Sequence, residues 1–255
     1  ENVLKKISEL QNNEMIGESP RKFESPIIII DPIDRNRNLG AAISTQNVTN
    51  FILIARNFLK KNSISYFKQK SKMKISLELA KNILVVNFKY KKRSDDIIYG
   101  QIKRASNSIE SQMIKEGFNV LRNDVVTYDE NKASLLFLLE SLKISKNEIR
   151  TGPDVFSNDF SNKFININAK KSKLMWTDKG GKLQSLQTRR YENAKVFLDK
   201  LIKNHIGESG IPKGLRLDFK NGFKITLGFN SKQNISVKKS ISKLITTDDT
   251  AFSTN

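Results

Sequence analysis

The 255-residue sequence contains no cysteine, one histidine (His205) and five prolines. The absence of cysteine excludes a disulfide scaffold, cysteine-ligated zinc, an iron–sulfur cluster and thiol catalysis. A single histidine excludes every site within one chain that needs two histidine ligands. No apolar run approaches the roughly 20 residues that span a bilayer, and the first residues do not form a signal peptide. We therefore expect a cytoplasmic protein that does not span a membrane.

Acidic residues are also scarce. The chain has 45 Lys+Arg against 26 Asp+Glu, a formal net charge of +19 and a pI near 9.9. Hydrophobic residues make up 38% of the sequence and include 15 Phe, enough to fill real cores, so general disorder is excluded. A large field of one sign attracts polyanions. Composition alone leaves nucleic acid and an acidic membrane surface as alternatives. A membrane-surface protein would show a cationic amphipathic helix, whereas the basic segments here are mostly loops or strand ends, so we expect no membrane partner.

The order of the predicted elements indicates an α+β fold of antiparallel sheets with packed helices. A strand at 83–90, a helix at 97–116 that ends at Gly117, and strands at 118–128 and 132–144 form a β-α-β-β module at about 83–145. The remaining patterns predict helices at 1–11, 45–61, 76–81, 160–169 and 189–205, and hairpins at 174–183 and 215–228. In the second hairpin, Asn221-Gly222 is the turn signal.

We predict four segments along the chain. The first, 1–26, is the end of a helix and a linker, and the second, 27–82, contains an Asp-Pro motif and a helix. The third, 83–150, is the β-α-β-β module, and the fourth, 151–255, is a basic α+β region that frays after residue 245. Because the opening helix has no start signal, we expect the chain to be part of a longer protein.

The first candidate for a catalytic or metal-binding motif is Asp31-Pro32-Ile33-Asp34. Metal-dependent nucleotidyl transfer needs two carboxylates on one strand face, and here they lie on either side of a proline turn. We expect Asp31, Asp34 and Asn38 to hold a turn that positions Arg37. Neither G-x-S-x-G, G-x-x-x-x-G-K-[ST] nor G-x-G-x-x-G occurs. The residues therefore predict no catalytic group, no metal site and no cofactor.

Basic residues are concentrated between Lys163 and Arg190, where eight of them accompany one acid, Asp178, and the only tryptophan, Trp176. Two interpretations stay open for the lysines, a solvated charged face or a phosphate-binding surface. Trp176 is likewise either a core residue or a platform for base stacking. Further basic segments at 68–74, 89–93 and 103–104 favour binding to a polyanion, because attraction to phosphates needs no special geometry.

Several segments together resemble one family. Residues 29–44, with the helix after them, are similar to the strand and D-P-V-D-x-x-R-N-V-A-A-x-L-S pattern of archaeal-type CCA-adding enzymes, the class I tRNA nucleotidyltransferases. Ser65-Tyr66-Phe67-Lys68 resembles the family's aromatic-aromatic-lysine element, and residues 95–106 resemble its D-D-x-L-Y-x-Q-L-x-R-A-S helix start. A strand at 135–142 and a turn at 150–153 complete the series.

The resemblance implies the end of the neck, the body and the tail of such an enzyme, without the catalytic head. Mg²⁺, CTP and ATP would belong to that head, so we expect this chain to be inactive alone. The family's body and tail hold the acceptor stem and TΨC arm of tRNA while its 3′ end is matured or repaired. A tRNA partner is therefore expected, and a homodimer as well, because family members commonly form dimers.

We expect RNA contacts from nine basic side chains, for one of which, Arg104, a salt bridge on its own helix is the alternative. They are Arg37, Lys68, Lys103, Arg104, Lys170, Lys171 and Lys173, with Arg189 and Arg190 behind them. Two other functions stay open. One is a free-standing module for double-stranded or structured RNA, although the strands carry no RNP-like aromatic motif. The other is a dimerisation domain whose charge only maintains solubility.

Overall fold

The computed structural model describes residues 2–67, 77–230, 232–248 and 250–252. The chain divides into two compact units, residues 1–73 with 246–255, and residues 74–245. Both contain helices and strands, and the larger sheets are antiparallel, which confirms the α+β class. The boundary expected at residue 150 falls inside a strand of the second unit.

The first unit is built around two helices and a small sheet. Its elements are α1 (Asn2–Glu9), β1 (Glu14–Ile16), β2 (Ile27–Ile29), α2 (Thr45–Lys60) and the 3₁₀ turns η1 (Leu39–Ala42) and η2 (Ile64–Phe67). The Ser44 hydroxyl accepts a hydrogen bond from the backbone N–H of Asn47 and so caps α2. Arg56 donates to the carbonyl of Ser8 at 2.7 Å and joins α2 to α1.

Three predictions for this unit need correction. Residues 12–26 are not only a linker, because they contain β1, which pairs in parallel with β2. The apolar periodicity of the helix predicted at 45–61 places Phe51 on its buried face, but the side chain is 51% exposed in α2. The chain does not fray throughout after residue 245, because Asn57 donates to the carbonyls of Thr250 and Ala251, both at 2.9 Å.

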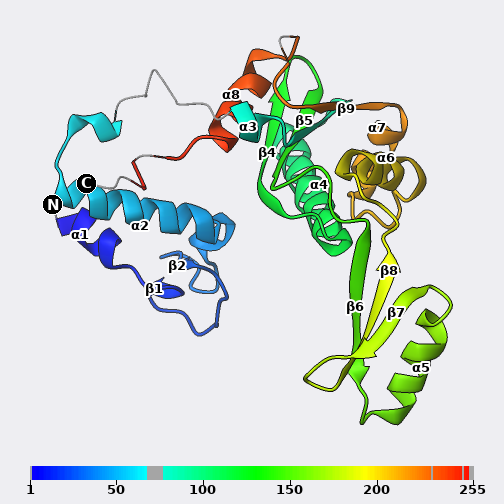
Figure 1. Cartoon of the computed structure of the whole chain (residues 1–255). Helices are drawn as coiled ribbons and strands as arrows, with labels where there is room; N and C mark the ends of the chain where they lie inside the picture. Colours follow the sequence, from blue (N-terminus) through cyan, green and yellow to red (C-terminus); the bar gives the residue numbers. More distant parts are fainter. Residues whose placement is uncertain (1, 68–76, 231, 249, 253–255) are drawn as a thin grey trace. The chain divides into compact units, whose positions relative to one another are not determined.

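A four-stranded antiparallel sheet forms the centre of the second unit (Figure 1). Its order is β4-β5-β3-β9, with bounds β3 (Ile83–Lys89), β4 (Val120–Tyr128), β5 (Lys132–Leu139) and β9 (Phe223–Leu227). Asp129 and Asn131, in the tight turn between β4 and β5, have positive φ angles of 48° and 67°, which Asp and Asn tolerate better than most residues. The predicted β-α-β-β module is thus confirmed, with β9 added at one edge.

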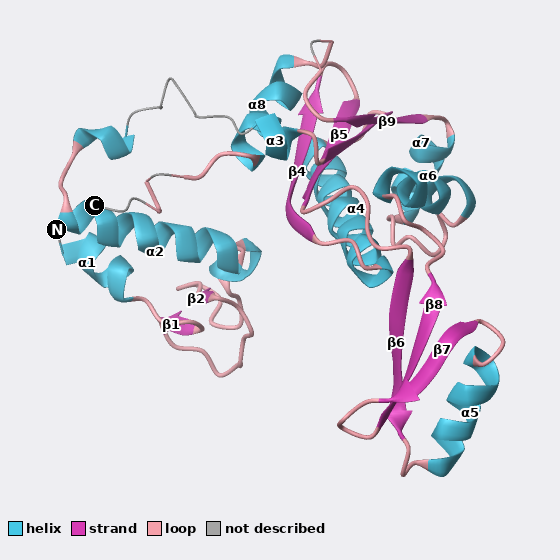
Figure 2. Ribbon diagram, viewed as in Figure 1, coloured by secondary structure: helices cyan, strands magenta, loops and turns pink. Residues whose placement is uncertain are grey.

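Helices cover both faces of this sheet (Figure 2). One face packs against α4 (Asp95–Glu116), α6 (Ala194–Asn204) and α7 (Lys213–Lys220), and the other against α3 (Leu77–Ala80) and α8 (Ile235–Leu244). The buried stripe of α4 consists of Ile98, Ile102, Ala105, Ile109 and Met113, none more than 2% exposed. Burial of each large side chain contributes roughly 1.5–3 kcal/mol before entropy is counted. We call this sheet with its helices the body.

The predicted hairpin at 215–228 is wrong. Residues Lys213–Lys220 form α7, and β9 after them pairs with β3 instead of with a neighbouring strand. Leu215 and Phe219, four residues apart on α7, are both buried, which is helical spacing. The buried Asp218 also joins α7 to the connection between β3 and α4. Its carboxylate lies 2.7 Å from Arg93 and accepts a hydrogen bond from the Lys91 N–H at 3.0 Å.

A second, three-stranded sheet leaves the body at one end, and we call residues 147–188 the arm (Figure 1). Its elements are β6 (Asn147–Asp154), α5 (Asn158–Asn168), β7 (Ser172–Thr177) and β8 (Lys182–Thr188), in the sheet order β6-β8-β7. The α5 side chain Phe164 packs on Gly152, where a Cβ would lie 2.8 Å from the ring. The expected hairpin at 174–183 is present, with its turn at 178–181.

Two predicted boundaries in this region differ from the structure. The turn expected at 150–153 lies within β6, and Pro153 is tolerated there because β6 is an edge strand with a register irregularity between Thr151 and Asp154. Helix α6 begins at Ala194 instead of Arg189, because the Asn193 side chain accepts from the N–H groups of Lys195 and Val196 and caps it.

Alanine substitutions at Gly100 inside α4 and at Gly117 directly after it should have opposite effects on stability. Gly117 ends the helix at φ +98°, and a Cβ there would lie 2.6 Å from Arg189 Nη1, whereas a Cβ on Gly100 would meet nothing within 4 Å. Gly117→Ala should lower the free energy of unfolding by about 1–2 kcal/mol. Gly100→Ala should raise it by about 0.5–1 kcal/mol, because alanine favours a helix interior. Urea unfolding followed by circular dichroism measures both. A Gly117→Ala variant as stable as the original chain would contradict this description of the helix end.

Candidate nucleic-acid interface

The loop after β2 is held by the side chains that the sequence marks as turn residues. Asp31 Oδ1 accepts from the N–H of Ile33 at 2.9 Å, and Asp34 Oδ1 accepts from the N–H of Asn36 at 3.0 Å. Asn38 Oδ1 accepts from the N–H groups of Ile29 and Gly40 at 2.9 and 2.8 Å. Between them the Arg37 side chain is 68% exposed, with its Nη1 3.8 Å from Asp31. The loop thus presents a cation on a braced backbone.

Helix α4 carries its predicted contact residues on the side away from the core. Lys103 and Arg104 are exposed, and the neighbouring Tyr99 ring is 48% exposed. Arg104 Nε lies 3.4 Å from the carbonyl oxygen of Gly100, so its partner is the helix backbone instead of an acid. Because the opposite stripe of α4 is buried, these cations are fixed to a rigid element.

The arm carries three predicted contact residues together. Lys170 and Lys171 lie in the turn after α5, Lys173 lies in β7, and all three are exposed. Lys173 Nζ donates to Asn147 Oδ1 at 2.7 Å. Trp176, also in β7, is only half-buried, so it is neither a core residue nor an open platform.

The acid within this basic segment, Asp178, is occupied by the turn between β7 and β8. Its carboxylate accepts from the N–H groups of Lys182 and Gly180 and from the Gln184 amide, at 3.0, 2.9 and 2.7 Å. These hydrogen bonds, that of Lys182 first, lower the pKa of Asp178. The carboxylate therefore stays ionised near neutral pH while it braces the turn.

Arg189 and Arg190 lie at the end of the arm where it meets the body, and they differ in exposure. Arg190 is exposed, with its guanidinium 5.2 Å from the centre of the Tyr191 ring. The Arg189 side chain is 14% exposed and donates to the carbonyls of Glu116 and Ser145 at 2.6 and 3.1 Å. Arg189 is thus placed as a structural contact between arm and body.

Two phenylalanines on the arm were not expected at a surface. Phe156, in the connection between β6 and α5, is 93% exposed, and Phe160 of α5 is 69% exposed. The sequence around them is irregular, so hydrophobic periodicity could not show which way they face. Exposed rings beside lysines are suited to contact unstacked bases.

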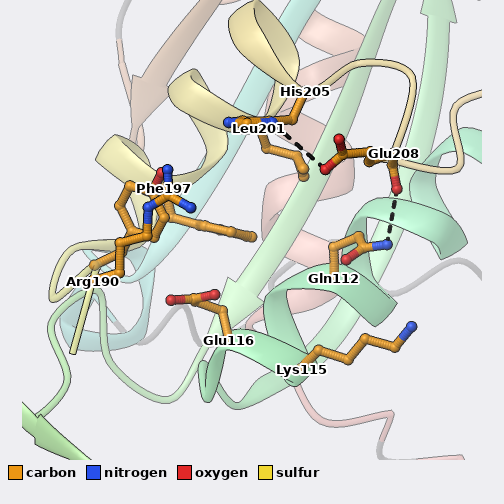
Figure 3. A pocket seen from close by; sticks show the side chains of 9 residues that line it. Gln112, Lys115, Glu116, Arg190, Phe197, Leu201, His205 and Glu208 are labelled. Carbon is orange, nitrogen blue, oxygen red and sulfur yellow. Dashed lines mark hydrogen bonds and ion pairs between the residues drawn. The ribbon is translucent and has the colours of Figure 1, made fainter. Parts of the chain in front are cut away.

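A shallow pocket of about 200 Å³ lies between α4 and α6 (Figure 3). Its walls are Gln112, Lys115, Glu116, Arg190, Tyr191, Phe197, Leu201, His205 and Glu208. His205 Nδ1 lies 3.5 Å from Glu208, and Gln112 donates to the Glu208 carbonyl at 3.2 Å. Burial, followed by the nearby Glu148 carboxylate, raises the pKa of Glu116. The carboxylates of Glu116 and Glu208 offset the cations of Lys115 and Arg190 on its walls, so the pocket offers a phosphate no excess of positive charge.

The described residues form neither a metal site nor a membrane-spanning helix. Within 2–67, 77–230, 232–248 and 250–252, no group of three or more His, Cys, Asp or Glu side chains could hold a metal ion. No helix in that part of the chain is long and apolar enough to cross a membrane. Lys68, a predicted contact residue, lies outside the described residues.

Two family models match successive parts of the chain. Residues 1–68 match "tRNA nucleotidyltransferase, second domain", and residues 80–228 match "CCA-adding enzyme, C-terminal domain". The second match covers more than half of the chain and includes the body sheet and the whole arm.

Several similar proteins carry the name CCA-adding enzyme. The one from Pyrobaculum islandicum is 29% identical over 192 residues, which cover 75% of this chain and 44% of the relative. Those from Saccharolobus shibatae and Saccharolobus solfataricus are each 34% identical, over 186 and 184 residues, and in both cases 71% of this chain and 42% of the relative are covered. The chain thus spans less than half the length of these relatives. It belongs to the CCA-adding enzyme family, of which it contains the C-terminal domain.

Proposed function

We propose that this chain is the tRNA-holding part of a CCA-adding enzyme. It binds the acceptor stem and TΨC arm, so that the tRNA 3′ end can be matured or repaired. Nucleotide addition, with Mg²⁺, CTP and ATP, is proposed for those parts of the longer relatives that the chain does not span. For the residues of this chain we propose binding and orientation of the tRNA.

The exposed lysines of the arm are the main support for this proposal. Lys170, Lys171 and Lys173 project from one small sheet-and-helix unit. Asp178 is the one acidic residue between residues 163 and 190, and its carboxylate accepts hydrogen bonds from the turn that contains it. From residue 163 to residue 188 the arm has six basic residues against this one acid, so the segment is net positive, and a polyanion that binds there releases its counterions.

The shape of an RNA stem fits such a surface. An A-form helix hides its base edges in a deep, narrow major groove and exposes phosphates and 2′-hydroxyls. A protein that must accept every tRNA gains from contacts that carry no sequence information. Lysines on the arm and on α4, held by rigid elements, supply contacts of that kind.

Two alternatives differ from this proposal in what they bind. A free-standing module for structured RNA would bind any duplex of sufficient length, without a preference for tRNA. A dimerisation domain would bind no RNA and would use its charge for solubility. A homodimer that also binds tRNA is compatible with the proposal, and sedimentation of the chain measures it.

Binding to three RNAs separates a tRNA-holding role from a dimerisation domain that binds no RNA. We expect intact tRNA and an acceptor–TΨC minihelix to bind about equally well, and single-stranded RNA of the same length to bind more weakly, in a fluorescence titration. The logarithm of the association constant should fall against the logarithm of salt concentration by roughly 0.7–0.9 per phosphate contacted. An affinity that ignores salt, or equal binding of all three RNAs, would rule out a tRNA-holding role.

Charge reversal on the arm locates the contacts. The triple variant Lys170→Glu, Lys171→Glu and Lys173→Glu should bind the minihelix about tenfold more weakly or worse, with a smaller salt slope. Thermal unfolding should change little, because the three side chains are exposed.

A control with the same change in net charge is Lys195→Glu, Lys200→Glu and Lys213→Glu, three exposed lysines of α6 and α7. It should lose much less affinity than the arm variant. Equal losses in the two variants would show that only net charge matters, and a collapse of thermal stability in the arm variant would make its lysines structural.

A further inference from the structure

Arg189 joins the arm to the body through several hydrogen bonds at once. It follows β8, and its own N–H donates to the carbonyl of Lys146 at 2.8 Å. The guanidinium then reaches three more groups. Nη1 donates to the carbonyl of Glu116 at 2.6 Å and to the Glu148 carboxylate at 3.2 Å, and Nε donates to the carbonyl of Ser145 at 3.1 Å. One side chain thus contacts the end of α4, strand β6 and the connection between β5 and β6.

The end of α4 is shaped to receive this guanidinium. The last carbonyls of a helix have no partner within the helix, and the helix dipole favours a cation beside them. Gly117, the residue after α4, carries no side chain where a Cβ would lie only 2.6 Å from Arg189 Nη1. The cation can therefore lie directly against the helix end. Its planar fork of donors suits several acceptors at fixed angles, which a lysine ammonium does not match.

Glu148 completes the junction from the side of the arm. Its carboxylate lies 3.2 Å from Arg189 and 2.7 Å from Arg150, and its own side chain is 18% exposed. The Arg150 side chain is 56% exposed and bonds to Glu148 of the same strand, so Arg150 is a control for Arg189.

We propose that Arg189 is a positioning residue that fixes the angle between arm and body, so that lysines of the arm and of α4 engage one RNA duplex together. The RNA part of this inference rests on the proposed function. The part about the angle between arm and body is independent of it. Two surfaces that bind one duplex in the correct geometry gain from effective concentration, and that gain becomes smaller when the angle between the surfaces is free to vary.

A distance measurement tests the angle without RNA. Because the chain has no cysteine, Asn107→Cys on α4 and Asn166→Cys on α5, both exposed positions, can be spin-labelled selectively in the full chain. Pulsed electron paramagnetic resonance should give a narrow distance distribution, unchanged by Arg150→Ala. The distribution should broaden in Arg189→Ala and also in Arg189→Lys, which keeps the charge but not the fork. Arg189 variants with the original width would overturn the proposal.

An RNA measurement on the same variants tests the consequence. Arg189→Ala and Arg189→Lys should bind the minihelix about tenfold more weakly, whereas a hairpin stem too short to reach both surfaces should be bound with nearly unchanged affinity. If Arg189→Lys binds the minihelix with full affinity, or if the variants lose the same affinity for both RNAs, then the cation at position 189 contacts RNA directly and the positioning role is wrong. If the original chain binds no RNA, the proposed function fails, and the distance distribution alone decides the role of Arg189.

Discussion

The packing of α4 against the body sheet is the interaction on which the rest of the second unit depends. Its buried stripe, from Ile98 to Met113, fills one face of the sheet together with α6 and α7. The same helix turns Lys103 and Arg104 outward, and its end at Gly117 receives Arg189 from the arm. One helix therefore supports the core, carries part of the cationic surface and anchors the arm.

Local patterns predicted the elements that local contacts stabilise. The periodicity of α4 and the strands on either side of the turn at 129–131 were visible because each forms within a short stretch of chain. The pairing of β9 was predicted wrongly because its partner, β3, lies about 140 residues earlier, and Asn221-Gly222 marks a helix end as readily as a hairpin turn. The three-residue strand β1 is too short to show alternation.

Candidate contact residues were harder to predict, because residue type does not show where a charge lies. Arg189 and Arg190 are adjacent in a basic run, yet one is nearly buried between helix and strand and the other is exposed. Phe156 counts as hydrophobic in composition but lies almost fully in solvent. The motif at 31–38 was more informative, because short polar side chains that bond their own backbone have a recognisable spacing.

The central claim is that a rigid cationic surface holds RNA stems by phosphate and shape. Comparing two minihelices that differ only by inversion of every base pair in the acceptor stem tests it most directly. The two affinities should lie within about twofold of each other at the same salt concentration, since phosphate contacts carry no sequence information. A preference of about tenfold or more, the size of a single specific base contact, would contradict it.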